Sequence, residues 1–357
     1  MKRIITAVVA LMAMLLTAQA QTRSQVPLAD PYILVDNNLY YAYGTHSANG
    51  IEVWVSDNLK EWKYEGLALN KANTTEQRWF WAPEVYYKNG EYIMYYSANE
   101  HLYVAKAAKP TGPFKQVGDM QMKPLLGDEK CIDSSVFFDD DGTAWLFFVR
   151  FNDGNCIWKC QLADDYITPV KNTLRKCINV TAAWESKLGR VCEGPNVLKH
   201  NKRYYLTYSA NDYRSQDYGV GYATTVNVAS GTWAKYSKNP VLQRVEGLVG
   251  TGHHSIFTDL DGKMRIVFHA HYSDTQVADR LMYIGTMEFD NIVLKMTDDP
   301  VIRPVKVSTL GVAAPSAADA AEVARYDISG RVATGSHRGV TIVRMSDGTV
   351  RKEVRVQ

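Results

Sequence analysis

Four carboxylic acids and one histidine stand at the start of five similar segments of this chain. They are Asp30, Glu84, Asp133, Glu193 and His253, and consecutive members lie 49 to 60 residues apart. Each leads an apolar run, a polar turn and a second, aromatic-rich run, which is the pattern of a β-hairpin. Hydrolysis of a glycosidic bond needs one protonated carboxyl for the leaving oxygen and one ionised carboxyl to activate water. A third carboxylate raises the pKa of the acid by repulsion. Asp30, Asp133 and Glu193 could supply this set.

The elements that must position these residues follow from the repeat. Five units of this length, each with two to four short strands, are typical of the blades of a β-propeller. The innermost strands of a propeller meet round one axis, so equivalent leading positions would gather at one end of one channel. Helical periodicity is rare after residue 20. The sequence therefore predicts an all-β chain with a five-bladed β-propeller catalytic domain at residues 26–305 and a small C-terminal β appendage.

The overall charge and the N-terminus limit the partners. The formal net charge is +2 over 357 residues, so no field favours nucleic acid or an acidic membrane. Lys2 and Arg3 precede an apolar run at 4–16 and an Ala18-Gln19-Ala20 site. This pattern predicts a signal peptide at residues 1–20, because the run is too short for a membrane span. We therefore expect an exported protein with no membrane span and no nucleic-acid partner.

The five cysteines are an odd number for an exported protein, so at least one thiol is expected to be free. Cys131 and Cys192 each lie beside a leading residue, and a bridge between them is an open alternative. Cys156 and Cys160 have no second pair or nearby histidine of the kind that a zinc site needs. We expect these two to be small apolar fillers.

Taken together, the motifs resemble glycoside hydrolase family 43, a family of five-bladed propellers that act on arabinose- and xylose-containing polysaccharides. The resemblance covers roughly residues 26–305 and depends on the order of the motifs, one or more in each blade. They are ADPY (29–32), YAYGT (41–45), SDNLKEW (56–62), WAPEV (81–85), IDSSVFFDDDG (132–142), EGPNVLK (193–199), GTGHHS (250–255) and FHAH (268–271).

The resemblance implies a role for each leading residue. Asp30 matches the general base, Glu193 the general acid, and Asp133 the carboxylate that tunes and orients the acid. His253 matches the axial histidine that in many relatives approaches a calcium ion through water, so calcium is the expected cofactor. Thr251 and His254 replace residues that are usual in the family, which bears on this metal environment.

Other residues are expected to contact the sugar. Arg280 resembles the arginine of the terminal-sugar subsite, and Trp81 resembles part of its wall. Glu84 either binds sugar hydroxyls or only braces its hairpin. Glu185, in a polar loop, is the weaker competitor of Glu193 for the acid.

The implied activity is that of an exo-acting, inverting glycosidase that releases terminal arabinose or xylose from plant polysaccharides such as xylan. The preferred interpretation is an α-L-arabinofuranosidase. The alternatives are a β-xylosidase, an exo-galactosidase of the same fold, and a non-catalytic propeller that captures glycans at the cell surface.

The end of the chain has its own resemblance. Residues 306–321 are small and mostly uncharged, which predicts a linker. Residues 322–357 are similar to the C-terminal sorting domains of the type IX secretion system, with Thr341 where tyrosine is usual. This implies type IX machinery as a partner and a cell-surface or extracellular location; without the sorting function the protein would be periplasmic.

Overall fold

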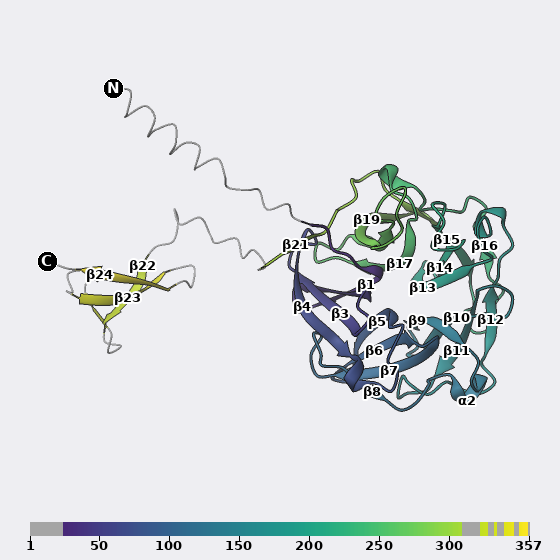
Figure 1. Cartoon of the computed structure of the whole chain (residues 1–357), viewed down its shortest axis with the longest axis horizontal. Helices are drawn as coiled ribbons and strands as arrows, with labels where there is room; N and C mark the ends of the chain where they lie inside the picture. Colours follow the sequence, from purple (N-terminus) through teal and green to yellow (C-terminus); the bar gives the residue numbers. More distant parts are fainter. Residues whose placement is uncertain (1–23, 309–321, 328–331, 334–338, 346–349, 356–357) are drawn as a thin grey trace, which may run out of the picture. The chain divides into compact units, whose positions relative to one another are not determined.

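Five antiparallel sheets surround a common centre in the computed structural model of this chain (Figure 1). The structure describes residues 24–308, 322–327, 332–333, 339–345 and 350–355. Strands make up 54% of the structure and helices 4%. The predicted all-β, five-bladed propeller is confirmed. The predicted signal peptide lies outside the described residues.

Each blade has four consecutive strands, ordered from the centre outward (Figure 1). Blade 1 contains β1 (Ala29–Asp36), β2 (Leu39–Thr45), β3 (Gly50–Ser56) and β4 (Glu61–Asn70). Blade 2 contains β5 (Trp81–Lys88), β6 (Glu91–Ala98), β7 (His101–Ala107) and β8 (Lys115–Val117). Blade 3 contains β9 (Cys131–Phe138), β10 (Ala144–Arg150), β11 (Cys156–Leu162) and β12 (Arg175–Ile178). Blade 4 contains β13 (Cys192–His200), β14 (Arg203–Ala210), β15 (Gly219–Thr225) and β16 (Ala234–Lys235). Blade 5 contains β17 (Gly252–Thr258), β18 (Met264–Ala270), β19 (Leu281–Asp290) and β20 (Val293–Met296).

The first hairpin of each blade turns where the sequence predicts. Two-residue turns with positive φ at both positions join the strands of blades 1, 2 and 4, as at Asn37 (φ 47°) and Asn38 (φ 60°). Such turns match the twist of the paired strands. Asp139 bonds back to Thr143 in blade 3, so the acidic run there is a hairpin turn. The described helices are short: η1 (Lys71–Asn73), α2 (Lys123–Leu126), η2 (Ala183–Glu185) and η3 (Val245–Gly247).

The hydrophobic core lies in the wedges between neighbouring blades. Along a second strand, alternate side chains face opposite blades, as strand geometry requires. In β10, Phe147 and Val149 pack with residues of blade 4, whereas Leu146 and Phe148 pack with residues of blade 2. This alternation tells which neighbour a given side chain faces.

The ring closes at blade 1. There β21 (Val305–Val307) pairs in parallel with β4 as the outermost strand. The amide of Val26 donates to the carbonyl of Pro304, and the amide of Met282 in blade 5 donates to the carbonyl of Val26. Segments from both ends of the propeller sequence therefore tie blades 1 and 5 together.

The chain divides into two units, residues 1–310 and residues 311–357. The second contains a three-stranded antiparallel sheet of β22 (Glu322–Asp327), β23 (Gly339–Met345) and β24 (Val350–Arg355). Parts of the predicted sorting motif, residues 328–331 among them, lie outside the described residues.

Two expectations about cysteines and membranes can be compared with the structure. All five cysteines are free, so no bridge joins Cys131 and Cys192, and the two sit on the innermost strands of different blades. No helix among the described residues has the length and apolar character needed to cross a membrane.

Candidate active site

Each innermost strand has one residue with positive φ near its start, and the register shifts there, which marks a β-bulge. We call these residues the leaders. They are Asp30 (φ 47°), Ala82 (φ 42°), Asp133 (φ 58°), Gly194 (φ 53°) and His253 (φ 42°). Four are not glycine, and such a backbone conformation costs free energy unless its surroundings hold it. The leaders mark the same structural position in all five blades.

The repeat phase inferred from the sequence is wrong in two blades, as the positions of the leaders show. Asp30, Asp133 and His253 are equivalent, as predicted. Glu84 lies two residues after its leader, Ala82, and Glu193 lies one residue before its leader, Gly194. In these two blades the bulge position holds a residue without an ionisable side chain, and hydrophobic alternation does not reveal where the bulge lies.

The propeller contains a well of about 340 Å³ at the end where the leaders lie. Its wall brings together most of the predicted site residues: Asp30, Trp81, Asp133, Glu193, His253 and Arg280. It also includes residues that the sequence did not single out: Glu100, Ile132, Phe151, Asn155, Val191, Asp212 and Tyr213. Glu84 does not line this well.

Asp30 is buried in the wall beside a full positive charge. Nη1 of Arg280 donates to its Oδ1 at 2.7 Å, and Nδ1 of His253 and of His269 each lie 3.3 Å from the same oxygen. Burial would raise the pKa of Asp30, but the Arg280 guanidinium, with smaller contributions from His253 and His269, outweighs burial and holds that pKa well below its usual range. Asp30 is therefore ionised at neutral pH.

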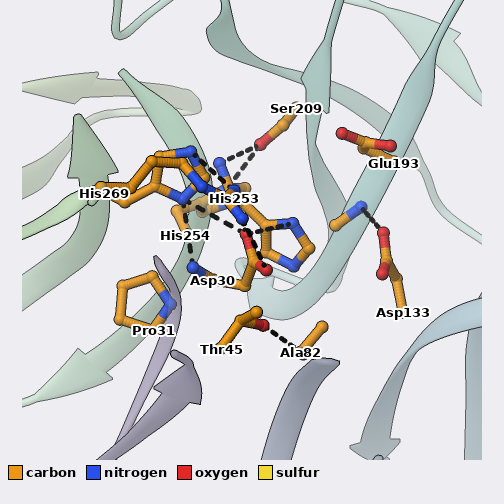
Figure 2. Close-up of polar contacts among 12 residues, drawn as sticks. Asp30, Pro31, Thr45, Ala82, Asp133, Glu193, Ser209, His253, His254 and His269 are labelled. Atoms are coloured by element: carbon orange, nitrogen blue, oxygen red, sulfur yellow. Dashed lines mark hydrogen bonds and ion pairs between the residues drawn. The ribbon is translucent and has the colours of Figure 1, made fainter. Parts of the chain in front are cut away.

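Glu193 lies in a different environment (Figure 2). The hydroxyl of Tyr218 donates to its Oε1 at 2.9 Å, and Nδ2 of Asn155 donates to its Oε2 at 3.0 Å. Burial raises the pKa of Glu193 to about 7; these hydrogen bonds oppose the rise, and repulsion by Asp30 adds to it. Glu193 thus retains its proton near neutral pH.

Asp133 links blade 3 to the strand that carries Glu193. Its Oδ2 accepts a hydrogen bond at 3.1 Å from the amide of Gly194, the residue directly after Glu193. Burial, followed by repulsion from Glu193 and Asp30, raises the pKa of Asp133 well above its usual value. Because both carboxyls titrate high and repel one another, we treat them as one pair that shares a proton.

Of the remaining predicted residues, Arg280 and Trp81 line the well, whereas Glu84 lines a separate, smaller cavity. Arg280 lies over the ring of Tyr213, with 4.7 Å between its Cζ and the ring centroid. Trp81 is stacked on Trp79, with 5.7 Å between ring centroids. A separate cavity of about 10 Å³ lies against Glu84 and all five leaders. Burial raises the pKa of Glu84 to about 8, and Tyr86 donates a hydrogen bond to it, so its position favours bracing.

Glu185 is placed away from the well. It is fully buried, and Nζ of Lys235 lies 2.6 Å from its Oε1. Tyr208 also donates to Oε1 at 2.6 Å. Burial opposes ionisation, but Lys235 and Tyr208 lower the pKa of Glu185 overall. An ionised, paired carboxylate outside the cavity does not suit a general acid.

The donors near His253 do not fit a calcium ion held by protein ligands. Calcium takes six to eight oxygen ligands, and no group of three or more His, Cys, Asp or Glu among the described residues could hold a metal. The axial cavity of about 10 Å³ has room for about one water. A calcium contact through water stays a prediction, which calcium titration of the dialysed protein would test.

Three residues that the sequence did not single out share one position with Arg280. Glu100, Asn155, Tyr218 and Arg280 each directly precede the third strand of their blade. In an antiparallel blade the first and third strands start at the same edge, so these residues return to the end where the leaders lie. Of the four, the sequence identified only Arg280. The other three could have been found by examining the residue directly before each predicted third strand.

Comparison with known proteins gives consistent results. The model of the family Glycosyl hydrolases family 43 matches residues 24–291. The chain is 29% identical to Beta-D-galactofuranosidase xynD of Aspergillus niger over 84% of this chain and 90% of that protein. It is 24% identical to Extracellular exo-alpha-(1->5)-L-arabinofuranosidase ArbA of Cellvibrio japonicus, over 77% and 87%. A crystal structure titled Endo-1,4-beta-xylanase from Bacteroides thetaiotaomicron superposes with a TM-score of 0.76 and 44% identity, over 80% of this chain and 99% of that one.

Proposed function

Because the chain belongs to glycosyl hydrolases family 43, we propose that it removes terminal α-L-arabinofuranosyl residues from plant polysaccharides or oligosaccharides, with Asp30 as base and Glu193 as acid. Membership of the family makes the protein a glycosidase that inverts the anomeric centre. The non-catalytic glycan-binding alternative is therefore set aside. The sugar, the exo action and the residue roles are the proposal.

One observation carries the residue roles: the well holds two carboxyls whose surroundings drive their ionisation apart. Asp30 is ionised beside Arg280, whereas Glu193 retains a proton to a pKa of about 7. A pair of titratable groups separated in this way supports the assignment of one as the base and the other as the acid of a hydrolytic site.

The chemistry then follows. Asp30 takes a proton from a water molecule, whose oxygen bonds to the anomeric carbon on the face opposite the leaving group. The bond from this carbon to the leaving oxygen breaks, and that oxygen takes the proton of Glu193. The separation of the two carboxyls expected for inversion, about 6.5–9.5 Å, leaves room for the water. Asp133 orients Glu193 through the Gly194 amide and, as a neighbouring carboxyl, helps Glu193 to stay protonated.

The size and charge of the well favour a short, neutral ligand. A cavity of about 340 Å³ is at the small end of ligand pockets, which run from about 300 to 1,000 Å³. Five carboxyls line it, from Asp30, Glu100, Asp133, Glu193 and Asp212. The one guanidinium in its wall, Arg280, is already paired with Asp30. A uronic acid would be repelled, so we infer a neutral terminal sugar.

Two of the relatives favour a furanose. One is named a β-D-galactofuranosidase and another an exo-α-(1→5)-L-arabinofuranosidase. The rings of β-D-galactofuranose and α-L-arabinofuranose carry hydroxyls in the same configuration and differ only in the substituent outside the ring. A pocket that accepts one could accept the other, so terminal β-D-galactofuranose is the second candidate sugar. A β-xylosidase is the next alternative, since family 43 relatives include proteins with that name.

The location remains part of the proposal. A curated relative is named extracellular, and the charge pattern of residues 1–20 supports export. The sorting role of residues 322–357 would be tested by deleting them and locating the protein in cell, outer-membrane and medium fractions. Retention in the periplasm would support the role.

Initial rates on three aryl glycosides, α-L-arabinofuranoside, β-D-galactofuranoside and β-D-xylopyranoside, test the sugar. We expect the highest kcat/KM on the arabinofuranoside and release of free arabinose from arabinan and arabinoxylan. Glu193→Ala should abolish release from a natural oligosaccharide and spare part of the turnover of the aryl substrate. A preference for the xyloside, or internal cleavage of xylan, would overturn the proposed specificity; unchanged turnover by Glu193→Ala would overturn the residue roles.

A further inference from the structure

The backbone amides of the leaders are held by a hydrogen-bond pattern that runs from blade to blade. In four cases the amide donates to a side chain on the second strand of the preceding blade; Figure 2 shows the pairs of Ala82, His253 and Asp30. Ala82 donates to Thr45 at 3.0 Å, Asp133 to Ser97 at 3.0 Å, His253 to Ser209 at 2.7 Å, and Asp30 to Nδ1 of His269 at 3.1 Å. Buried amides need such partners, so each polar side chain satisfies the bulge of the next blade.

Blade 3 breaks this pattern at Val149. Thr45, Ser97, Ser209 and His269 are each paired across the ladder with the residue directly before their own leader. Val149 occupies the same position, paired with Ile132, and is fully buried. A valine cannot accept a hydrogen bond. The amide of Gly194, the leader of blade 4, donates to Oδ2 of Asp133 instead.

The side chain of Val149 faces the Gly194 strand. Val149 packs in the wedge between blades 3 and 4, in the same cluster as Cys192 at the start of β13. By the alternation of the strand, its neighbour Phe148 faces the other way, toward blade 2. By comparison with the four polar cases, a hydroxyl at position 149 would point at the Gly194 amide.

We propose that Val149 is a positioning residue for the Asp133–Glu193 pair: by offering no acceptor, it leaves the Gly194 amide to the carboxylate of Asp133. This inference rests on the proposed function, since it matters for catalysis only if Glu193 is the acid. The donated hydrogen bond favours the ionised form of Asp133. The proton that the pair shares is thereby left on Glu193, where it is needed.

Val149→Thr tests the proposal, because threonine has the shape of valine and adds the acceptor found in blade 1. We expect its hydroxyl to accept the hydrogen bond of the Gly194 amide in place of Asp133. Asp133 would then bind the shared proton, and Glu193 would lose it. Turnover of an arabino-oligosaccharide should fall by about tenfold or more, as the loss of a hydrogen bond to a charged group implies. Turnover of an aryl arabinofuranoside, whose leaving group needs less protonation, should fall much less.

Val149→Ala is the control, because it removes volume without adding an acceptor. Its ratio of oligosaccharide to aryl turnover should match that of the wild type, even if its melting temperature falls. A Val149→Thr ratio equal to that of Val149→Ala would overturn the proposal. If Val149→Thr does not fold, Val149→Ser against Val149→Ala decides in the same way, since they differ by one oxygen. Glu193→Gln separates the two ideas: if it retains full activity on the oligosaccharide, the proposed function itself fails.

Discussion

The two sides of the well differ in what surrounds their carboxyls. On the side formed by blades 1 and 5, Asp30 contacts a guanidinium and two imidazole rings. On the side formed by blades 3 and 4, Glu193 and Asp133 contact a phenol, a carboxamide and a backbone amide, none of which carries a full charge. All three carboxyls are buried. Burial alone therefore does not decide which acid keeps its proton.

The difference shows that one cation, Arg280, separates the ionisation of Asp30 from that of Glu193. The charge of Arg280 is the strongest influence against burial at Asp30 and lowers the pKa of that carboxyl. The neutral donors at Glu193 oppose burial less effectively, and the pKa of Glu193 still rises to about 7. Burial keeps the pKa of His253 and His269 low, so these rings add little charge at neutral pH.

The largest effect is expected from Asp30→Asn. The variant keeps the shape of the side chain but cannot take the proton of water, so kcat/KM should fall by about 10³-fold, within the usual range for a general base. Both aryl and oligosaccharide substrates should lose activity equally, because the base is needed whatever the leaving group. Initial rates on both substrates measure this, with a melting curve to show that the variant folds. Residual activity within tenfold of wild type would contradict the role.

Arg280→Met should remove the charge that distinguishes the surroundings of Asp30 from those of Glu193. Without the guanidinium, burial raises the pKa of Asp30 toward or above its usual value. Since Asp30 works only when ionised, the acid limb of the profile of kcat/KM against pH should move to higher pH, and activity should fall by roughly 10- to 100-fold. Arg303→Met is the control, because this exposed arginine pairs with Glu246 and neither residue lines the well. An acid limb that stays in place would show that Arg280 does not set the ionisation of Asp30.

Tyr218→Phe should shift the opposite limb by a smaller amount. The hydroxyl favours the ionised form of Glu193, so its loss raises the pKa of Glu193, and the basic limb should move up by about one pH unit. Tyr205→Phe is the matched control. It removes a hydroxyl that donates to the carbonyl of Ile292, between the two outer strands of blade 5. A downward shift would reverse the sign of this contact.

Lys235→Met should change stability and leave both limbs in place. It leaves Glu185 buried without its cation, which costs about 3 kcal/mol in comparable buried pairs. Urea unfolding measures the free energy of unfolding, and the pH profile gives the second readout. The double variant Glu185→Gln with Lys235→Met should recover part of the loss. A moved pH limb in the single variant would show that Glu185 affects the well after all.

The propeller fold could be predicted from the sequence because its hairpin turns are encoded locally. Asn37-Asn38 and the acidic turn at Asp139 fix hairpins whatever surrounds them, and five copies fix the number of blades. The same repeat brought Asp30, Asp133 and His253 to one end of the ring. It misplaced the phase at Glu84 and Glu193, because the bulge positions of those two blades hold Ala82 and Gly194, which carry no ionisable side chain.

The surroundings of the acids could not be predicted from local pattern. Asn155 and Tyr218 contact Glu193 only because separate blade strands begin at the same edge. The role suggested for Val149 depends on comparing five blades in space, and a buried valine in a strand gives no signal by itself. The sequence thus indicated which acids meet, and the structure shows how their ionisation is separated.

The pH dependence of kcat/KM for wild type and Glu193→Gln, on an aryl arabinofuranoside, tests the central claim most directly. For the wild type we predict an acid limb below pH 4, from Asp30, and a basic limb near pH 7, from Glu193, whose pKa is about 7. In Glu193→Gln the basic limb should disappear while the acid limb remains. A basic limb that persists in Glu193→Gln would contradict the assignment of Glu193 as the group that holds the catalytic proton.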